Sequence, residues 1–237
     1  MRVTREANAL RLLSINVVRG LLAQVVLVSL ISPAFPGPPP DSASLDGGSS
    51  KSALILCHGR GKHPRWQVVD PLRKTVHEEL GWHTLSLQMP ADDKHAWEYA
   101  GDFPDAFEGI KRGIAFLVQE KGVEAVYLMG HSMGARMVSA FVAEHPNASV
   151  KGLIVAGVRN NGGPPFDGKQ SLTTVKVPVL DIWGDGGNGK DSRFARERET
   201  LLSTRYQQVP IAGANHKFSD YEREFTDAVI AWLKAQP

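Results

Sequence analysis

The sequence predicts a doubly wound α/β domain built on a mostly parallel sheet of about six strands. From residue 52 onward, short apolar runs alternate with longer segments of helical periodicity, and turn residues separate them. This alternation is typical of a parallel sheet with helices on both faces. The chain has 237 residues, of which 42% are hydrophobic. That is enough for one sizeable core and too little for two comfortable domains.

Six apolar runs are the predicted strands, and each is bounded by turn residues or by a helical pattern. They cover residues 52–57, 83–87, 125–129, 153–156, 177–183 and 206–209. No room is expected for an additional antiparallel meander before Ser52.

Five segments have helical periodicity. In one of them the apolar residues Phe107, Ile110, Ile114 and Leu117 recur at helical spacing. Another has Pro71 near its start and Gly81 after its end, which are typical positions for these residues at helix boundaries. The predicted helices cover residues 67–80, 104–120, 133–144, 191–203 and 220–233.

The first 51 residues have a different composition from the rest. A basic stretch precedes the apolar run 21–31, and small residues and prolines follow, which is the order of a secretory signal peptide. We therefore expect residues 1–34 to direct export, with a periplasmic location. The alternatives are an inner-membrane anchor over residues 12–31 and a wrongly assigned start codon. Residues 35–51 are expected to be a Pro/Gly/Ser-rich linker without a fold of its own, and residues 52–237 the folded domain.

Charge and cysteine content exclude several classes of function. The formal net charge is +2, and residues 1–34 account for +3, so the remainder stands at −1. The domain therefore has no net positive field to attract nucleic acid. Cys57 is the only cysteine, so no intramolecular disulfide can form. The histidines show no convincing metal-ligand spacing, and we expect neither a metal nor a cofactor.

The segment Gly130-His131-Ser132-Met133-Gly134 lies between a predicted strand and a predicted helix. A Gly-x-Ser-x-Gly turn in that context is typical of a nucleophile elbow, in which a strained turn lifts the serine hydroxyl above the sheet. Small residues on either side allow the strand and the helix to approach each other. We predict that Ser132 is a nucleophile. The simpler alternative is a glycine-rich connection without chemistry.

A serine hydroxyl needs a base, and the base needs an orienting acid. His216 is the last histidine in the chain and follows the last predicted strand, where the base is expected. Asp185 follows the penultimate strand and is the predicted acid. Asp191, which is expected to cap the next helix, and Asp181, which lies inside the strand, are the alternatives.

An oxyanion hole in such a site takes two backbone N–H groups. The first is expected from Met133, the residue after the nucleophile. We assign the second to Arg60, in the loop His58-Gly59-Arg60-Gly61 after the first predicted strand. His58 itself is expected to support this loop.

With these motifs, the chain resembles the α/β-hydrolase superfamily over essentially all of residues 52–236. Segments 58–61, 71–73 and 81–90 are similar to an uncharacterised bacterial branch whose members tend to be exported. The resemblance implies a triad of Ser132, Asp185 and His216, with Arg60 and Met133 as oxyanion donors. The sequence departs from the superfamily in one respect. Members often place the acid three residues after the glycine that ends the penultimate strand, and Gly187 occupies that position here.

The resemblance implies acyl transfer on a small-molecule substrate. The connection 157–173 is too short for a large lid, so a small-to-medium carboxylic ester is expected, with loops 89–103 and 157–173 forming an aromatic and charged mouth. Lactone, thioester or peptide cleavage would use the same residues. The alternative from another class is a catalytically silent hydrolase-like binding protein of the cell envelope. The oligomeric state is open.

Overall fold

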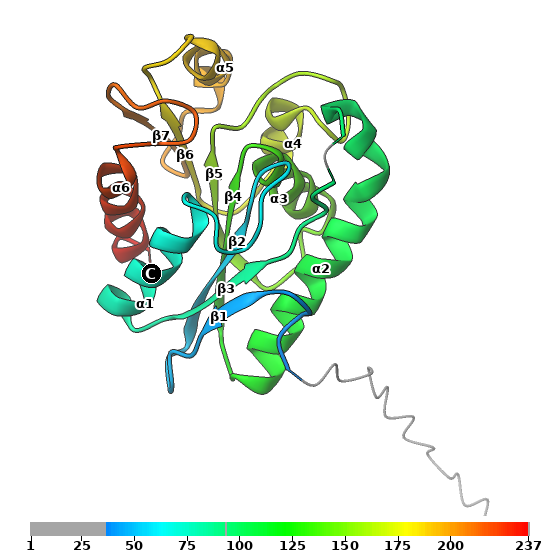
Figure 1. The fold of residues 1–237 in the computed structure, drawn as a ribbon, viewed down its shortest axis with the longest axis vertical. Coiled ribbons are helices and arrows are strands. Elements are labelled where there is room, and N and C mark those ends of the chain that lie inside the picture. Colours follow the sequence, from blue (N-terminus) through cyan, green and yellow to red (C-terminus); the bar gives the residue numbers. More distant parts are fainter. Residues whose placement is uncertain (1–36, 93, 237) are drawn as a thin grey trace, which may run out of the picture. The chain divides into compact units, whose positions relative to one another are not determined.

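A computed structural model describes residues 37–92 and 94–236 of the chain (Figure 1). The predicted signal peptide or anchor at residues 1–34 lies outside this described part. Seven strands form one sheet in the order β1-β3-β2-β4-β5-β6-β7. The strands are β1 (Ala43–Leu45), β2 (Ser52–Cys57), β3 (His83–Leu87), β4 (Ala125–His131), β5 (Val150–Ala156), β6 (Val179–Gly184) and β7 (Tyr206–Ile211).

The predicted parallel sheet is confirmed. Strands β2 to β7 pair with one another in parallel, and β2 lies between β3 and β4. Residues 53–57 of β2 are completely buried, as expected for a strand that is covered on both faces. Because the carboxyl ends of these strands meet at one edge, the loops that follow them converge there.

The prediction that residues 35–51 form an unstructured linker is wrong for residues 43–45. These residues form β1, which pairs antiparallel with β3, and Ala43 lies opposite Ser86. Ala43 is buried whereas Ser44 is exposed, so even this short strand has an inner and an outer face. Without β1, β3 would present its unpaired backbone groups at the sheet edge. The sheet therefore has one more strand than predicted, and that strand is antiparallel.

Helices cover both faces of the sheet (Figure 1). On one side lie the first and last helices, and on the other lie α2, α3 and α4. The short helix α4 was not predicted; the Asp167 carboxylate caps it by accepting from Gln170 N at 3.0 Å. The helices are α1 (Val69–Leu80), α2 (Phe103–Ala115), α3 (Met133–Glu144), α4 (Gly168–Thr174), α5 (Lys190–Glu197) and α6 (Glu222–Lys234).

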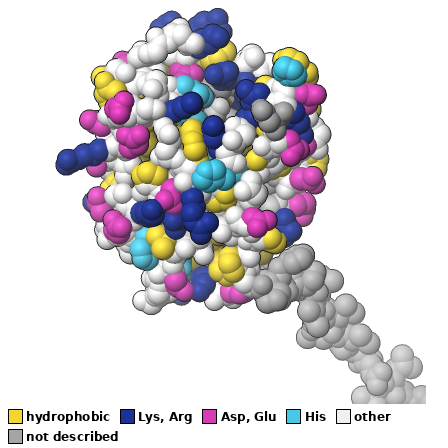
Figure 2. Space-filling model, in the orientation of Figure 1, with side chains coloured by type: hydrophobic (Ala, Val, Ile, Leu, Met, Phe, Trp, Pro, Cys, Tyr) yellow, Lys and Arg dark blue, Asp and Glu magenta, His cyan; other side chains and the backbone are white. Residues whose placement is uncertain are grey.

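Two buried hydrophobic clusters hold these layers together, one on each face of the sheet. Ile55 belongs to the cluster that packs against α2 and α3, and Leu54 to the cluster that packs against α1 and α6. This division follows from the alternation of side chains along a strand. On the face shown in Figure 2, hydrophobic side chains form small separate patches among charged ones. Within the described ranges, no helix has the length and apolar character needed to cross a membrane.

Cys57 ends β2 and is completely buried. Burial raises the pKa of its thiol far above the ordinary value, because the charged thiolate would be desolvated there. The thiol is therefore protonated in the folded protein, and this protonated state makes it unreactive.

A buried ion pair joins β6 to the segment after α5. Arg198 donates to both carboxylate oxygens of Asp181, at 2.9 and 2.8 Å, and both side chains are completely buried. The hydroxyl of Tyr206 and the amide of Gln208 also donate to Asp181, each at 2.9 Å. The remaining guanidinium nitrogen of Arg198 donates to the Val158 carbonyl at 3.0 Å and to the Asn160 side chain at 2.7 Å. The pair thus fixes the loop after β5.

Candidate active site

Ser132 lies in a strained turn between β4 and α3. Its backbone has φ +55° and ψ −110°, a conformation that side-chain-bearing residues seldom adopt. Ser132 N donates to the Ala156 carbonyl at 2.8 Å, which ties the turn to β5. A Cβ atom at Gly134 would collide with the carbonyl oxygens of Cys57 and His58. Glycine is therefore required at that position, because the start of α3 passes directly over the end of β2.

His216 lies in the loop between β7 and α6, at the same edge of the sheet. Its Nδ1 is 2.6 Å from the Asp191 carboxylate, which is 8% exposed. Gly157 allows this arrangement, because a Cβ there would lie 2.8 Å from His216 Cε1. Ser132 and His216 line the same cavity. Their side chains are not hydrogen-bonded to each other among the described residues, and in enzymes such bonds often tighten only with substrate.

The structure does not place Asp185 beside His216, so the predicted pairing is wrong. Asp185 Oδ1 instead accepts a hydrogen bond from Gly213 N at 2.6 Å, and Gly186 N donates to the Ala214 carbonyl at 2.9 Å. These bonds hold the loop that carries His216. The physical reason is the length of the glycine-rich turn after β6, which carries the chain past Asp185 and brings Asp191, in the first turn of α5, to the imidazole.

Asp181, the other alternative, is fully engaged by Arg198 and faces the interior. The carboxylate at His216 is therefore that of Asp191. From the sequence, Asp191 was expected to cap a helix, and for that reason Asp185 was preferred as the acid. The available signal was an aspartate that follows a run of glycines after the penultimate strand.

His131 is a residue whose place in the site the sequence did not indicate. It is 2% exposed, and its Nε2 lies 2.8 Å from the His216 carbonyl, to which it donates. Burial above all, and then the neighbouring His216, lower the pKa of His131 to about 3. The ring is therefore neutral at ordinary pH. Through this hydrogen bond, His131 at the end of β4 positions the backbone of His216 relative to the neighbouring Ser132.

The predicted oxyanion donors both line the cavity that contains Ser132. Met133 is the first residue of α3, and the first N–H groups of a helix have no intrahelical acceptor. A Cβ at Gly59 would lie 3.3 Å from Ser132 Cβ, so the loop that carries Arg60 passes close to the serine.

His58 supports this loop, as expected from the sequence. Its Nδ1 donates to the Gly59 carbonyl at 2.9 Å, and its Nε2 accepts from Met89 N at 3.0 Å. The latter bond connects the loop after β2 to the loop after β3. Burial lowers the pKa of His58 to about 4, which keeps the ring neutral.

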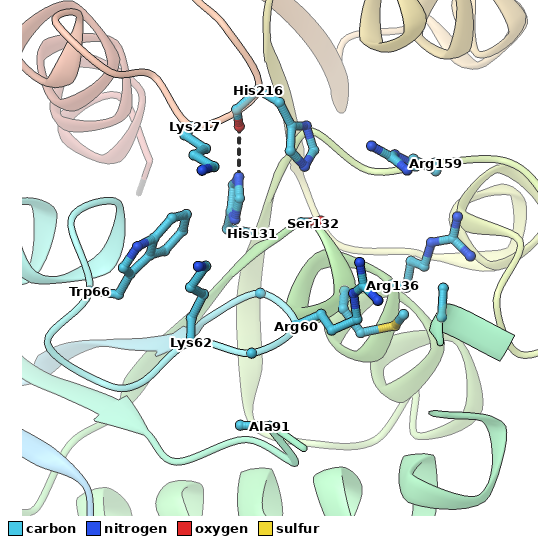
Figure 3. Close-up of a pocket in the computed structure, with 14 residues that line it drawn as sticks. Arg60, Lys62, Trp66, Ala91, His131, Ser132, Arg136, Arg159, His216 and Lys217 are labelled. Carbon is cyan, nitrogen blue, oxygen red and sulfur yellow. Dashed lines mark hydrogen bonds between the residues drawn. The ribbon is translucent and has the colours of Figure 1, made fainter. Parts of the chain in front are cut away.

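The cavity at this edge of the sheet has a volume of about 600 Å³ (Figure 3). The loops predicted to form its mouth contribute Ala91, Ala96 and Arg159. The expected aromatic lining from these loops is wrong: Trp97 is 69% exposed and does not line the cavity, while Tyr99, Phe103 and Phe166 belong to the buried core. The aromatic residue at the cavity is Trp66, and the basic residues Lys62, Arg136 and Lys217 also line it without having been predicted.

The chain belongs to a family described as "Protein of unknown function (DUF3530)", which it matches over residues 101–235. No curated protein matches the chain.

Solved structures confirm the predicted fold. Est1E from Butyrivibrio proteoclasticus, solved with ferulic acid bound, is 16% identical with a TM-score of 0.64, and the match covers 82% of this chain and 94% of that one. An α/β serine hydrolase homologue from Coxiella burnetii is 20% identical with a TM-score of 0.66, covering 83% and 94%. A serine hydrolase without a lid from Xanthomonas campestris is 18% identical with a TM-score of 0.58, covering 84% and 88%. The protein thus has a minimal α/β-hydrolase fold.

Proposed function

We propose that the protein is a serine hydrolase that cleaves a carboxylic ester, or a related acyl bond, of a small-to-medium substrate. The observation that carries the proposal is the position of Ser132. It lies on a strained strand–helix turn at a cavity that His216 also lines, and the His216 Nδ1 is 2.6 Å from the buried Asp191 carboxylate. Nucleophile, base and orienting acid are the three parts that acyl transfer requires.

In the proposed mechanism, Ser132 Oγ attacks the ester carbonyl carbon while His216 Nε2 takes the hydroxyl proton. The N–H groups of Met133 and Arg60 stabilise the oxyanion of the tetrahedral intermediate. The intermediate collapses, the C–O bond to the alcohol breaks, and His216 returns the proton to the leaving alcohol. Water then attacks the acyl-enzyme with the same proton transfers and releases the acid. Asp191 stabilises the imidazolium in each step.

The size of the cavity and the character of the structural relatives support a small acyl substrate. A volume of about 600 Å³ suits a modest ester. One structural neighbour, Est1E, was solved with ferulic acid, a small carboxylic acid. The short connection over residues 157–173 contains only the helix α4, which is too small to form a broad apolar lid.

We also propose that residues 1–34 direct export to the periplasm, on the basis of their signal-like sequence. Mass spectrometry of the exported protein tests this proposal: a mature chain that begins after residue 34 is expected. Retention of the apolar run would instead indicate the membrane anchor.

A fluorophosphonate probe tests the nucleophile. We expect covalent labelling of the wild type at Ser132, loss of labelling in Ser132→Ala, and turnover of short p-nitrophenyl esters by the wild type only. A well-folded wild type with neither labelling nor turnover would contradict the proposal and favour a silent binding protein.

The identity of the acid is tested by two matched substitutions. Asp191→Asn is expected to lower kcat by about 10³–10⁴-fold, because the imidazole loses its orienting charge. Asp185→Asn removes the same charge, but the Asp185 carboxylate bonds to Gly213 N and not to His216. The expected loss of kcat is therefore below about tenfold. The reverse order of effects would return Asp185 to the triad.

A further inference from the structure

The Lys, Arg, Asp and Glu residues that line the cavity beside Ser132 are all of one sign, positive. Five cationic residues line it, and no aspartate or glutamate of the described chain does so. The chain as a whole has 27 Lys and Arg against 25 Asp and Glu, so composition does not account for the excess. In Figure 3, Lys62 and Lys217 lie on one side of Ser132, and Arg136 and Arg159 lie on the other. The five are Arg60, Arg136 and Arg159, and Lys62 and Lys217.

Arg136 is the most deeply placed of these cations. It is only 6% exposed and lies one helical turn after Ser132 on α3. Its guanidinium donates to the Asn161 carbonyl at 3.0 Å and to the Asn161 side chain at 2.6 Å, both neutral acceptors. Burial first, and then the neighbouring Arg159, lower the pKa of Arg136 to about 10, against a smaller opposing effect of Asp167. Two like charges therefore face the same space.

The Arg159 guanidinium has an unused hydrogen-bond donor. Its Nε is buried and has no hydrogen-bond partner among the described residues. An unpaired buried donor is costly, and an anion would remove that cost. The guanidinium also forms no ion pair within the described ranges.

The backbone around Arg159 is held in place on both sides. The buried Arg198 donates to the Val158 carbonyl and to the Asn160 side chain, and Gly168 N donates to the Arg159 carbonyl at 2.9 Å. The residues next to Arg159 are thus fixed before any ligand arrives. A pre-organised binding group loses little freedom on binding.

We propose that Arg136 and Arg159 bind a carboxylate on the substrate, so that the preferred substrate is an acyl compound with a negative charge in addition to its scissile ester. A guanidinium matches a carboxylate in shape and supplies charge-assisted hydrogen bonds. This inference rests on the proposed function, because it describes the substrate of the same site.

Paired esters test the inference. The first pair is the mono-p-nitrophenyl ester of adipic acid and its neutral analogue, in which an amide replaces the free carboxylate. The second pair carries the charge on the alcohol side: 4-carboxyphenyl acetate against 4-carbamoylphenyl acetate. For one of the pairs, we expect the anionic ester to have a kcat/KM about tenfold or more above that of the neutral ester. That pair identifies the side on which the carboxylate binds. Ratios near or below one for both pairs would overturn the inference.

Substitutions then connect the preference to the two arginines. Arg159→Gln and Arg136→Gln are expected to lower the anionic-to-neutral ratio by about fivefold or more, and Arg159→Lys to retain part of it. Arg223→Gln is the matched control: it removes the same charge from α6, where the side chain is 90% exposed, and should leave the ratio unchanged. An equal ratio in Arg159→Gln and Arg223→Gln would contradict the assignment.

Calorimetry on Ser132→Ala separates this inference from the proposed function. In one of the two pairs, this variant is expected to bind the anionic ester more tightly than the neutral one, whether or not the wild type turns either over. If wild-type Ser132 is not labelled by fluorophosphonate, the proposed hydrolase fails, while tighter binding of an anionic ester would still support the anion site. Equal dissociation constants for the anionic and neutral esters in both pairs would overturn the anion site itself.

Discussion

Two regions of this molecule, the scaffold around Asp181 and the cavity beside Ser132, place arginine in different surroundings. Arg198, on the scaffold side, forms a two-pronged ion pair with Asp181, and its other donor is also bonded. Arg136 and Arg159, at the cavity, meet neutral acceptors or none among the described residues. The histidines divide similarly. His58 uses both ring nitrogens, whereas His131 has a buried Nδ1 without a partner in the described chain.

The difference separates scaffold from site. A buried charge is costly unless it is paired, so the paired Arg198 is explained by the fold alone. The cavity arginines are not explained in this way, and a ligand is their natural partner. The two regions are also connected, because Arg198 fixes the residues on both sides of Arg159.

The largest effect is expected from breaking the scaffold pair. Arg198→Met leaves the Asp181 carboxylate buried without a counter-charge and should lower the free energy of unfolding by about 3–5 kcal/mol. Urea denaturation followed by tryptophan fluorescence measures this change, with Arg223→Met as an exposed control. Adding Asp181→Leu to Arg198→Met should recover part of the loss. A loss below about 1 kcal/mol in the single variant would mean that the pair is not needed by the scaffold.

The next effect concerns pH. The pKa of His131 is about 3 in the folded protein and about 6.5 in the unfolded chain, so between these values the unfolded state binds one more proton. Stability should therefore fall as pH falls below about 6.5, by about 1.4 kcal/mol per pH unit for this residue. In urea titrations between about pH 4.5 and 6, His131→Gln should reduce the slope by about one proton. An unchanged slope in His131→Gln would contradict the neutral buried ring.

The smallest effect on stability is expected at the cavity. Arg159→Gln removes a charge that repels Arg136 and breaks no ion pair of the described chain, so the free energy of unfolding should change by less than about 1 kcal/mol, upward if at all. Urea denaturation at low salt is the measurement. A loss of several kcal/mol would place Arg159 with Arg198 in the scaffold and weaken the argument for an anion site.

Much of the fold could be predicted because its signals are local. The strands at 52–57 and 83–87 and the helix at 133–144 have the bounds expected from their apolar patterns. The strand β1 was missed because a run of only three residues carries little pattern, and its structure depends on pairing with the edge of β3. A contact between segments far apart in sequence leaves no periodic signal of its own.

The candidate site likewise has parts that the sequence predicted and parts that depend on contacts between distant segments. The elbow at Ser132 and the loop of His216 follow from chain order, and the structure brings both to one cavity. The choice between Asp185 and Asp191 depended on the path of a glycine-rich turn, which no local pattern determines. The cluster of cations could not be predicted either, because its residues come from four separate segments, none of which indicates a binding site on its own.

The burial of Cys57 gives the protein a built-in reporter. It is the only thiol in the chain and lies at the end of β2, which pairs with β3 on one side and β4 on the other. A thiol reagent can reach it only when this part of the sheet opens, so the labelling rate measures the largest opening motions of the domain. The same property makes serine-directed probes selective, since the folded chain offers them no competing thiolate.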